Sequence, residues 1–149
     1  MTTWAQFENE AGDLAASIRA RFEAAETHIL ATLRKDGSPR VSGSEVQFTG
    51  GDLTFGSMLN AVKARDLQRD GRCAIHAHPS EGGDAKVAGI AREVTGEAKN
   101  AYVTGSEPAE GFHAFRLELS EAVMTSVEGG ELVIRVWRPG LGVRTFRRN

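Results

Sequence analysis

The side chains best suited to chemistry in this sequence are three polar residues that could gather around an anion: Arg40, Ser57 and Lys63. Guanidinium and ammonium groups make charge-assisted hydrogen bonds to phosphate or carboxylate oxygens. Ser57 and Lys63 also stand where a short strand gives way to a helix, and the first amides of a helix direct unpaired N–H groups toward an anion. These residue types predict an anion site if the strands that carry Arg40 and Ser57 are neighbours. The alternative is that Lys63 is an ordinary solvated lysine.

The strand expected around Arg40 has small side chains. Val41 shares one face of this strand with Gly43 and Glu45, whereas Ser42 lies on the other face with Arg40. Glycine in a strand often marks the close approach of a ligand or of another backbone. Two interpretations stay open: a ligand lies against this strand, or the strand is an edge that needs little side-chain volume.

Other reactive side chains carry weaker signals. His76 and His78 lie two residues apart on one strand face, a spacing that can chelate a metal, but no cysteine or carboxylate pattern joins them. We therefore predict no metal site. Cys73 is interpreted as a small core residue. Asp66 and Asp70 are interpreted as surface acids of a helix, paired with neighbouring arginines.

Composition excludes several classes of protein. The sequence has no Gly-x-Gly-x-x-Gly, Walker loop, His-Glu-x-x-His or Gly-x-Ser-x-Gly motif. Its net charge of −2 implies no general attraction to nucleic acid or to an anionic membrane. One cysteine excludes an internal disulfide and fits a reducing compartment. With no secretory pattern and no run of roughly 18 apolar residues, the expected location is the cytoplasm.

A leading helix and a set of strands must position these residues. The length of 149 residues predicts one domain, 1–149, with a single core. Apolar residues recur at spacings of three and four across 1–26, which predicts a helix of about six turns packed on the sheet. Thr3 and Gln6 fit a capping box at its start.

Alternating apolar residues predict the strands that follow. The expected strands are 28–33, 40–48, 53–55, 73–77, 86–95, 115–127 and 132–136, with a short helix over 59–70 and a short helix and loop over 100–114. Most are joined by hairpin turns, and they do not alternate with helices. We therefore predict a mainly β, α+β fold: a six- to seven-stranded antiparallel barrel with an N-terminal helix and a short helix after the third strand.

Several segments of the sequence resemble a known family. LATLRKDGSPRVSG, LTFGS and KARDLQRDGRCAIHAHP, followed by WRPGLGVRTFRR near the end, are similar to the pyridoxamine 5'-phosphate oxidase-like flavin-binding proteins, which have a split β-barrel fold. The resemblance extends from about Glu26 to Arg147. The similarity is to the short, actinobacterial-type members of this family. The run Lys-Ala-Arg-Asp-Leu, which begins at Lys63, is its most specific part.

This resemblance implies a homodimer with cofactor grooves at its interface. The cofactor would be FMN, or the deazaflavin coenzyme F-420 in some branches. Residues 40–45, which include Arg40, Val41, Ser42 and Gly43, would border the ring and ribityl chain. Ser57 and Lys63 would hold the phosphate. Trp137 and Arg144 would approach the cofactor bound mainly by the other subunit.

The chain departs from the oxidases of this family at two positions. Val62 stands where they usually have an arginine before the phosphate-binding lysine, and Gly56 stands where they commonly have an aromatic residue. Their long C-terminal portion is also absent or much shortened here. These departures argue against vitamin B6 phosphates as the substrate and make the deazaflavin a rival cofactor.

The resemblance therefore implies an FMN-binding oxidoreductase that acts by hydride transfer on a small organic substrate. Such a protein needs no catalytic acid–base pair of its own, because the cofactor performs the chemistry. One alternative is a reductase that depends on coenzyme F-420. A second is a carrier or sensor of a flavin or tetrapyrrole without turnover.

Overall fold

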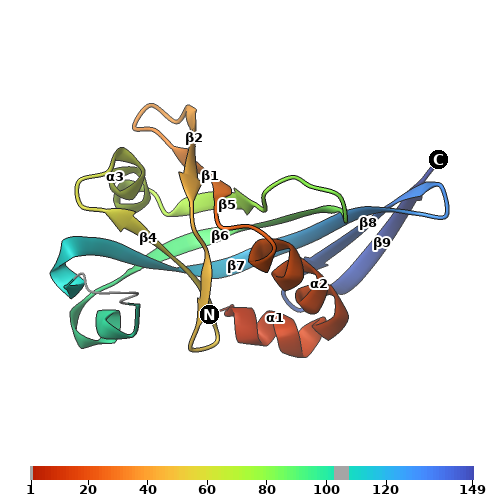
Figure 1. Ribbon diagram of the computed structural model, residues 1–149, viewed down its shortest axis with the longest axis horizontal. Helices are drawn as coiled ribbons and strands as arrows, with labels where there is room; N and C mark the ends of the chain where they lie inside the picture. Colours follow the sequence, from red (N-terminus) through yellow and green to blue (C-terminus); the bar gives the residue numbers. More distant parts are fainter. Residues whose placement is uncertain (1, 103–107) are drawn as a thin grey trace.

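The computed structural model describes residues 2–102 and 108–149, which form mainly antiparallel strands (Figure 1). The helices are α1 (Trp4–Glu10), α2 (Gly12–Glu23) and α3 (Val62–Arg69), with 3-10 helices η1 (Gly96–Tyr102) and η2 (Ala109–Gly111). The described residues form nine strands: β1 (His28–Leu33), β2 (Pro39–Ser44), β3 (Gln47–Thr49), β4 (Asp52–Met58), β5 (Arg72–His76), β6 (Asp84–Val94), β7 (Phe112–Glu128), β8 (Glu131–Arg138) and β9 (Gly142–Arg148).

The long strand β7 connects two parts of the sheet. It has 17 residues and pairs with β6 along most of its length. Its first residues pair with β4 and its last residues pair with β8. The strand order is β2-β1-β5-β6-β7-β4-β3, and β8 and β9 extend from the last part of β7. In Figure 1 these two strands form an arm that reaches toward the C-terminus.

A bulge interrupts the ladder between β6 and β7. The register shifts between Ala88 and Gly89. A Cβ atom on Gly89 would lie 2.0 Å from the carbonyl oxygen of Glu118, so a side chain does not fit there without movement of the backbone. The bulge lies between the part of β7 that pairs with β4 and the part that pairs with β8, and a bulge of this kind bends the strand.

The predicted fold class is confirmed, and two further strands are present. The expected strand 40–48 divides: β2 pairs with β1, whereas β3 pairs with β4, so the chain crosses from one part of the sheet to another between them. The basic end of the chain forms β9, an edge strand that pairs with β8. Of the expected helix and loop at 100–114, residues 103–107 lie outside the described part of the chain.

The predicted N-terminal helix of 1–26 is two helices rather than one. Ala11 has φ −148° and ψ 56°, which breaks the helix immediately before Gly12. Thr3 caps α1 as predicted, because its Oγ1 accepts a hydrogen bond of 3.1 Å from the amide of Gln6. The Gln6 side chain does not return the bond but donates to Glu10 instead. The break lets both helices lay apolar residues on the sheet.

One hydrophobic cluster fills the space between these helices and the sheet. Trp4 and Phe7 of α1 pack against Phe48 and Trp137, with ring centroids 4.5–5.0 Å apart. Other fully buried members are Ile18, Phe22, Leu30, Leu53, Phe55, Ile75, Phe115 and Leu117. Within the part of the chain that the structure describes, no helix is both long and apolar enough to cross a membrane.

Candidate functional site

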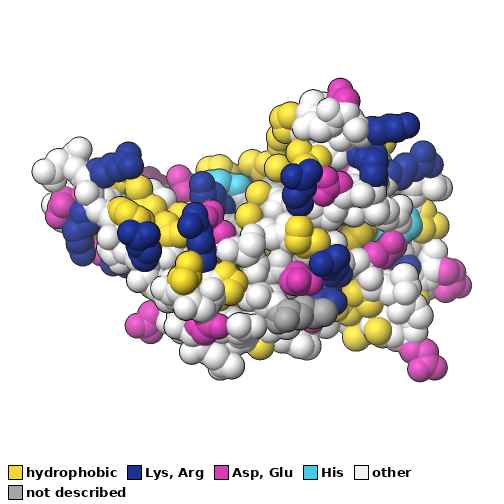
Figure 2. Space-filling view, turned by 180° about the vertical axis from the view of Figure 1, so that it is seen from behind, with side chains coloured by type: hydrophobic (Ala, Val, Ile, Leu, Met, Phe, Trp, Pro, Cys, Tyr) yellow, Lys and Arg dark blue, Asp and Glu magenta, His cyan; other side chains and the backbone are white. Residues whose placement is uncertain are grey.

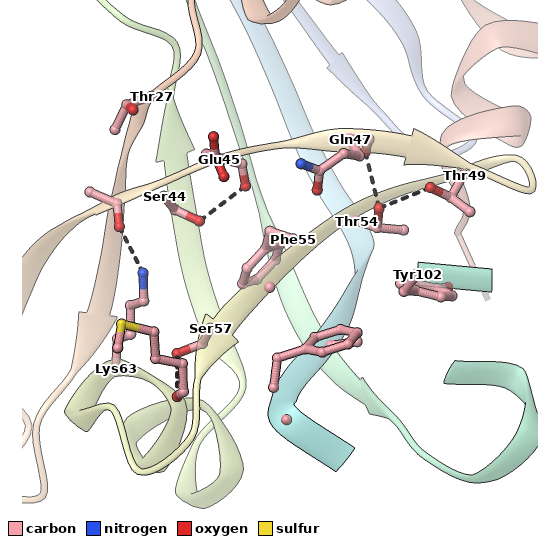
Figure 3. Close-up of a pocket in the computed structure, with 16 residues that line it drawn as sticks. Thr27, Ser44, Glu45, Gln47, Thr49, Thr54, Phe55, Ser57, Lys63 and Tyr102 are labelled. Carbon is pink, nitrogen blue, oxygen red and sulfur yellow. Dashed lines mark hydrogen bonds between the residues drawn. The ribbon is translucent and has the colours of Figure 1, made fainter. Parts of the chain in front are cut away.

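A groove of about 500 Å³ lies where the chain crosses from β2 to β3 (Figure 3). The segment from Gly43 to Thr49 forms one wall and β4 forms the other. The start of α3 closes one end, and Tyr102 lies at the other. The lining residues are Thr27, Gly43, Ser44, Glu45, Gln47, Thr49, Thr54, Phe55, Gly56, Ser57, Met58, Lys63, Tyr102, Gly111, Phe112 and Ala114.

Lys63 is the cation of this groove. It lies in the first turn of α3, and its Nζ donates a hydrogen bond of 2.8 Å to the carbonyl oxygen of Gly43. Burial lowers the pKa of the Lys63 ammonium group from its usual value. Ser57, near the end of β4, is buried, and its hydroxyl donates to the carbonyl of Met58 at 3.3 Å. Lys63 and Ser57 both line the α3 end of the groove, and their role in holding a phosphate stays a prediction.

The start of α3 adds backbone donors at this end. Asn60 has φ 63°, a left-handed conformation that asparagine tolerates, and turns the chain from β4 toward the helix. The N-cap residue is Ala61, which supplies no side-chain hydrogen bond to the first turn. The side chain of Ala61 therefore does not cap the opening amides of α3, and Lys63 brings the first turn of this helix to the groove.

The middle and far end of the groove are aromatic and polar. Phe55 and Phe112 line the middle, and Phe55 stacks on Phe115 behind it with centroids 5.6 Å apart. At the far end the hydroxyls of Thr49 and Thr54 lie 3.3 Å apart.

Tyr102 completes the far end. Burial, and then the nearby charge of Asp52, raise the pKa of the Tyr102 phenol, so it remains a hydrogen-bond donor. Of the described residues that line the groove, Lys63 and Glu45 carry charge. The arrangement suits an elongated ligand with an anionic group at the Lys63 end and a planar portion beside Phe112.

The structure brings together only some of the predicted site residues. Gly43, Ser57 and Lys63 line the groove. Arg40 does not: its Nε donates to Asp66 at 2.7 Å, and its guanidinium is held beside α3. Val41 is 68% exposed on the outer face of β2. The hydroxyl of Ser42 is buried without a partner among the described residues, and it does not line the groove.

Trp137 and Arg144 lie on opposite faces of the β8–β9 hairpin. Trp137 pairs with Val143, and the adjacent pair joins Val136 to Arg144, so the two predicted residues point in opposite directions. Trp137 is fully buried against Phe7 in the core. We correct its expected place at a subunit interface, because its own helix α1 covers it. Arg144 is exposed, and its expected role stays a prediction.

The far end of the groove was missed from the sequence. Gln47, Thr49 and Thr54 are brought there by the short β3–β4 hairpin, in which Gln47 pairs with Thr54. The Gly50-Gly51 turn between these strands was a visible signal for that hairpin. Nothing in the sequence pointed to Tyr102, which comes from a 3-10 helix rather than from a periodic element.

The two histidines that the sequence offered for a metal site, His76 and His78, take part in local hydrogen bonds. The amide of His78 donates to Nδ1 of His28 at 2.9 Å, and His76 Nδ1 lies 2.6 Å from the Ala77 carbonyl. Among the described residues, no three histidine, cysteine, aspartate or glutamate side chains gather in a geometry suited to a metal.

The fold and the groove define an antiparallel split-barrel protein with a ligand groove beside a short helix. The sequence model of the family described as Pyridoxamine 5'-phosphate oxidase matches residues 14–126. Because this match covers more than half of the chain, the protein belongs to that family. A search of curated proteins finds no match to the sequence.

Solved structures agree on the fold. A pyridoxamine 5'-phosphate oxidase-related, FMN binding protein from Nostoc punctiforme matches with TM-score 0.68 and 14% identity, over 93% of this chain and 95% of that one. PhzG from Burkholderia lata, solved with tetrahydrophenazine-1-carboxylic acid, matches with TM-score 0.64 and 16% identity, over 91% and 88%. A pyridoxinephosphate oxidase family protein from Clostridium acetobutylicum matches with TM-score 0.62 and 10% identity, over 91% and 94%. At these identities the similarity shows the shared fold.

Proposed function

We propose that this protein binds FMN in the groove and acts as a flavin-dependent oxidoreductase on a small organic substrate. The observation that carries the proposal is the convergence of Ser57 and of Lys63, in the first turn of α3, at one end of the groove. Family membership and the FMN-binding relative from Nostoc punctiforme support it.

The residues present fit FMN in size and in chemistry. A volume of about 500 Å³ lies within the range of about 300–1,000 Å³ that is usual for small-molecule sites. Lys63, Ser57 and the first amides of α3 would hold the phosphate by charge-assisted and backbone hydrogen bonds. Phe55, Phe112 and Tyr102 offer the ring system apolar and aromatic surface.

The protein would bind and orient the cofactor rather than react itself. Bound FMN would supply the hydride or electron transfer. Lys63 attracts the phosphate, whereas the carboxylate of Glu45, which also lines the groove, repels an anion. Because Lys63 lies at the α3 end of the groove, we expect the phosphate to bind at that end.

We also propose that the protein works as a homodimer. The strand register places Ile29, Val41, Val127, Leu132 and Phe146 on one face of the sheet, and all are at least 38% exposed. Figure 2 shows apolar and basic side chains together on the β8–β9 arm, at the left of that view. Apolar side chains from five strands on one exposed face suit a self-complementary interface between two copies.

The proposed interface would meet the groove. Gly43 pairs with Ile29 and so shares this face, yet it also lines the groove. Arg144 lies on the same face, with its guanidinium 5.4 Å from the ring centroid of Phe146. In a dimer, Arg144 would be available to a cofactor held mainly by the partner subunit.

Light scattering coupled to gel filtration tests the dimer. The wild-type protein should elute with twice the mass of one chain, and Val41→Asp should shift it toward the monomer, because a charge would then be buried at the interface. Leu59→Asp, an exposed apolar residue outside this face, is the control. A wild-type monomer at micromolar concentration would refute the proposal.

The charge of the groove favours FMN over coenzyme F-420. The anionic tail expected of the deazaflavin needs a basic groove, whereas the charged lining residues here are Lys63 and Glu45. Val62, which replaces the usual arginine, is 53% exposed and adds no cation.

Titration of the purified protein with FMN, riboflavin and coenzyme F-420 tests the assignment of the cofactor. FMN should bind most tightly, and its absorbance should bleach and recover when an electron donor and then an acceptor are added. Tight binding of coenzyme F-420 without FMN binding would replace the proposal by the deazaflavin alternative. Bound FMN that no donor reduces and no acceptor reoxidises would leave a carrier or sensor of the flavin. Binding of a tetrapyrrole in place of all three would indicate a tetrapyrrole carrier.

A further inference from the structure

Asp66 is the one charged residue among those classed as fully buried in the described part of the chain, with 1% exposure. Its Oδ2 accepts hydrogen bonds from Thr32 Oγ1 and Arg40 Nε, both at 2.7 Å. Its Oδ1 accepts from Arg69 Nη2 at 3.0 Å. The donors come from β1, β2 and α3, so this carboxylate joins the helix to both strands beside it. These hydrogen bonds and the arginine charges outweigh the burial and hold the pKa of Asp66 below its usual value.

The helix that carries Asp66 has only a small apolar face against the sheet. It has eight residues, and its buried apolar side chains are Ala64 and Leu67. A helix of this length is not stable by itself and depends on its tertiary contacts. With so small an apolar face, the helix depends on polar contacts to the strands, and those of Asp66 are the most buried among them.

Asp66 and Lys63 connect the same helix to the same strand. They are three residues apart on α3 and therefore on one side of it. On β2, Arg40 binds Asp66, and the carbonyl of Gly43 accepts from Lys63. Two contacts thus hold α3 against β2, one inside the protein and one at the groove. The inner contact also keeps the Arg40 guanidinium beside α3.

We propose that Asp66 is a positioning residue: through Arg40 and Arg69 it holds Lys63 and the start of α3 where they can bind the phosphate of the cofactor. This inference rests on the proposed function. It implies that Asp66 acts on the phosphate alone, because the expected contacts to the ring system come from β4, Tyr102 and Phe112, none of which shares a hydrogen bond with Asp66.

A comparison of FMN with riboflavin, which lacks the phosphate, tests the inference. Asp66→Asn keeps the shape of the side chain but removes its charge. Asp66→Asn should weaken FMN binding by about tenfold or more, the cost typical of a misplaced charged hydrogen bond. The riboflavin dissociation constant should remain nearly unchanged. Asp70→Asn is the matched control, because Asp70 pairs with Arg72 at the exposed end of the same helix.

Two further variants keep the test decisive. If Asp66→Asn does not fold, Arg40→Lys, which keeps the charge but changes the geometry of the Arg40–Asp66 pair, should produce a smaller loss of the same kind. In a Lys63→Ala background, Asp66→Asn should cost less than it does in the wild-type protein, because the two substitutions share the Lys63 contact.

The outcomes separate the inference from the proposed function. An equal loss of FMN and riboflavin affinity would show that Asp66 only stabilises the fold and would refute the inference. So would an unchanged FMN affinity in Asp66→Asn when Lys63→Ala loses it. A wild-type protein that binds neither flavin would overturn the proposed function, and the inference with it.

Discussion

Replacement of Lys63 by alanine tests the groove directly. A hydrogen bond to a charged group contributes about 1.5–3 kcal/mol. In the ligand-free protein, however, Lys63 Nζ already donates to the Gly43 carbonyl at 2.8 Å. An ammonium group has three N–H donors, so Lys63 can keep this bond and still donate to the cofactor phosphate. The loss in Lys63→Ala should therefore be about 1.5–3 kcal/mol, or about 10- to 150-fold in the dissociation constant of FMN.

The assay is the quenching of FMN fluorescence at fixed ionic strength, with riboflavin measured in parallel. Lys35→Ala, in an exposed turn, is the control for the loss of one positive charge. A pH series adds a second signature. Burial lowers the pKa of Lys63, so the FMN affinity of the wild-type protein should fall as the pH rises through that lowered value, whereas the variant should lack this step. Unchanged FMN affinity, or an equal loss for riboflavin, would remove Lys63 from the phosphate site.

Three further predictions concern the fold. Trp137→Ala should lower the free energy of unfolding by about 3–5 kcal/mol in urea titrations, because a fully buried ring is lost; an unchanged midpoint would contradict its place in the core. Gly89→Ala should destabilise the protein by at least about 1 kcal/mol, because its Cβ would meet the Glu118 carbonyl at 2.0 Å. Gly12→Ala, with nothing within 4 Å, is its control in thermal melts. Burial lowers the pKa of His28 below its ordinary 6.5, so stability should decline as the pH falls below that value, and His28→Gln should flatten the decline.

Periodicity predicted the elements that have a buried face. β7 and β8 alternate apolar residues toward the core, and both were found within a few residues of their limits. β9 was missed because almost all of its side chains are exposed. Its sequence therefore shows no alternation of buried and exposed residues. The break at Ala11 was missed because the apolar spacing of three and four continues across it.

The local part of the site was predictable, and the long-range part was not. Ser57 and Lys63 lie six residues apart at a strand–helix junction, where spacing alone suggests an anion site. Asp66 was interpreted as a surface acid, because a helix of charged residues gives no sign that one of them is buried. Its partner Arg40 is 26 residues away. Trp137 was misplaced for a similar reason, since its burial depends on Phe7 in a helix at the other end of the chain.

The two halves of β7 allow one part of this protein to diverge without the other. Residues 112–116 hold β4 and the floor of the groove, whereas residues 122–128 hold β8 and the arm, and the bulge opposite Gly89 lies between them. A change in the arm should therefore leave the groove of the same subunit intact, even where it alters the proposed interface. Assembly and groove geometry would then be inherited as separate traits of one strand.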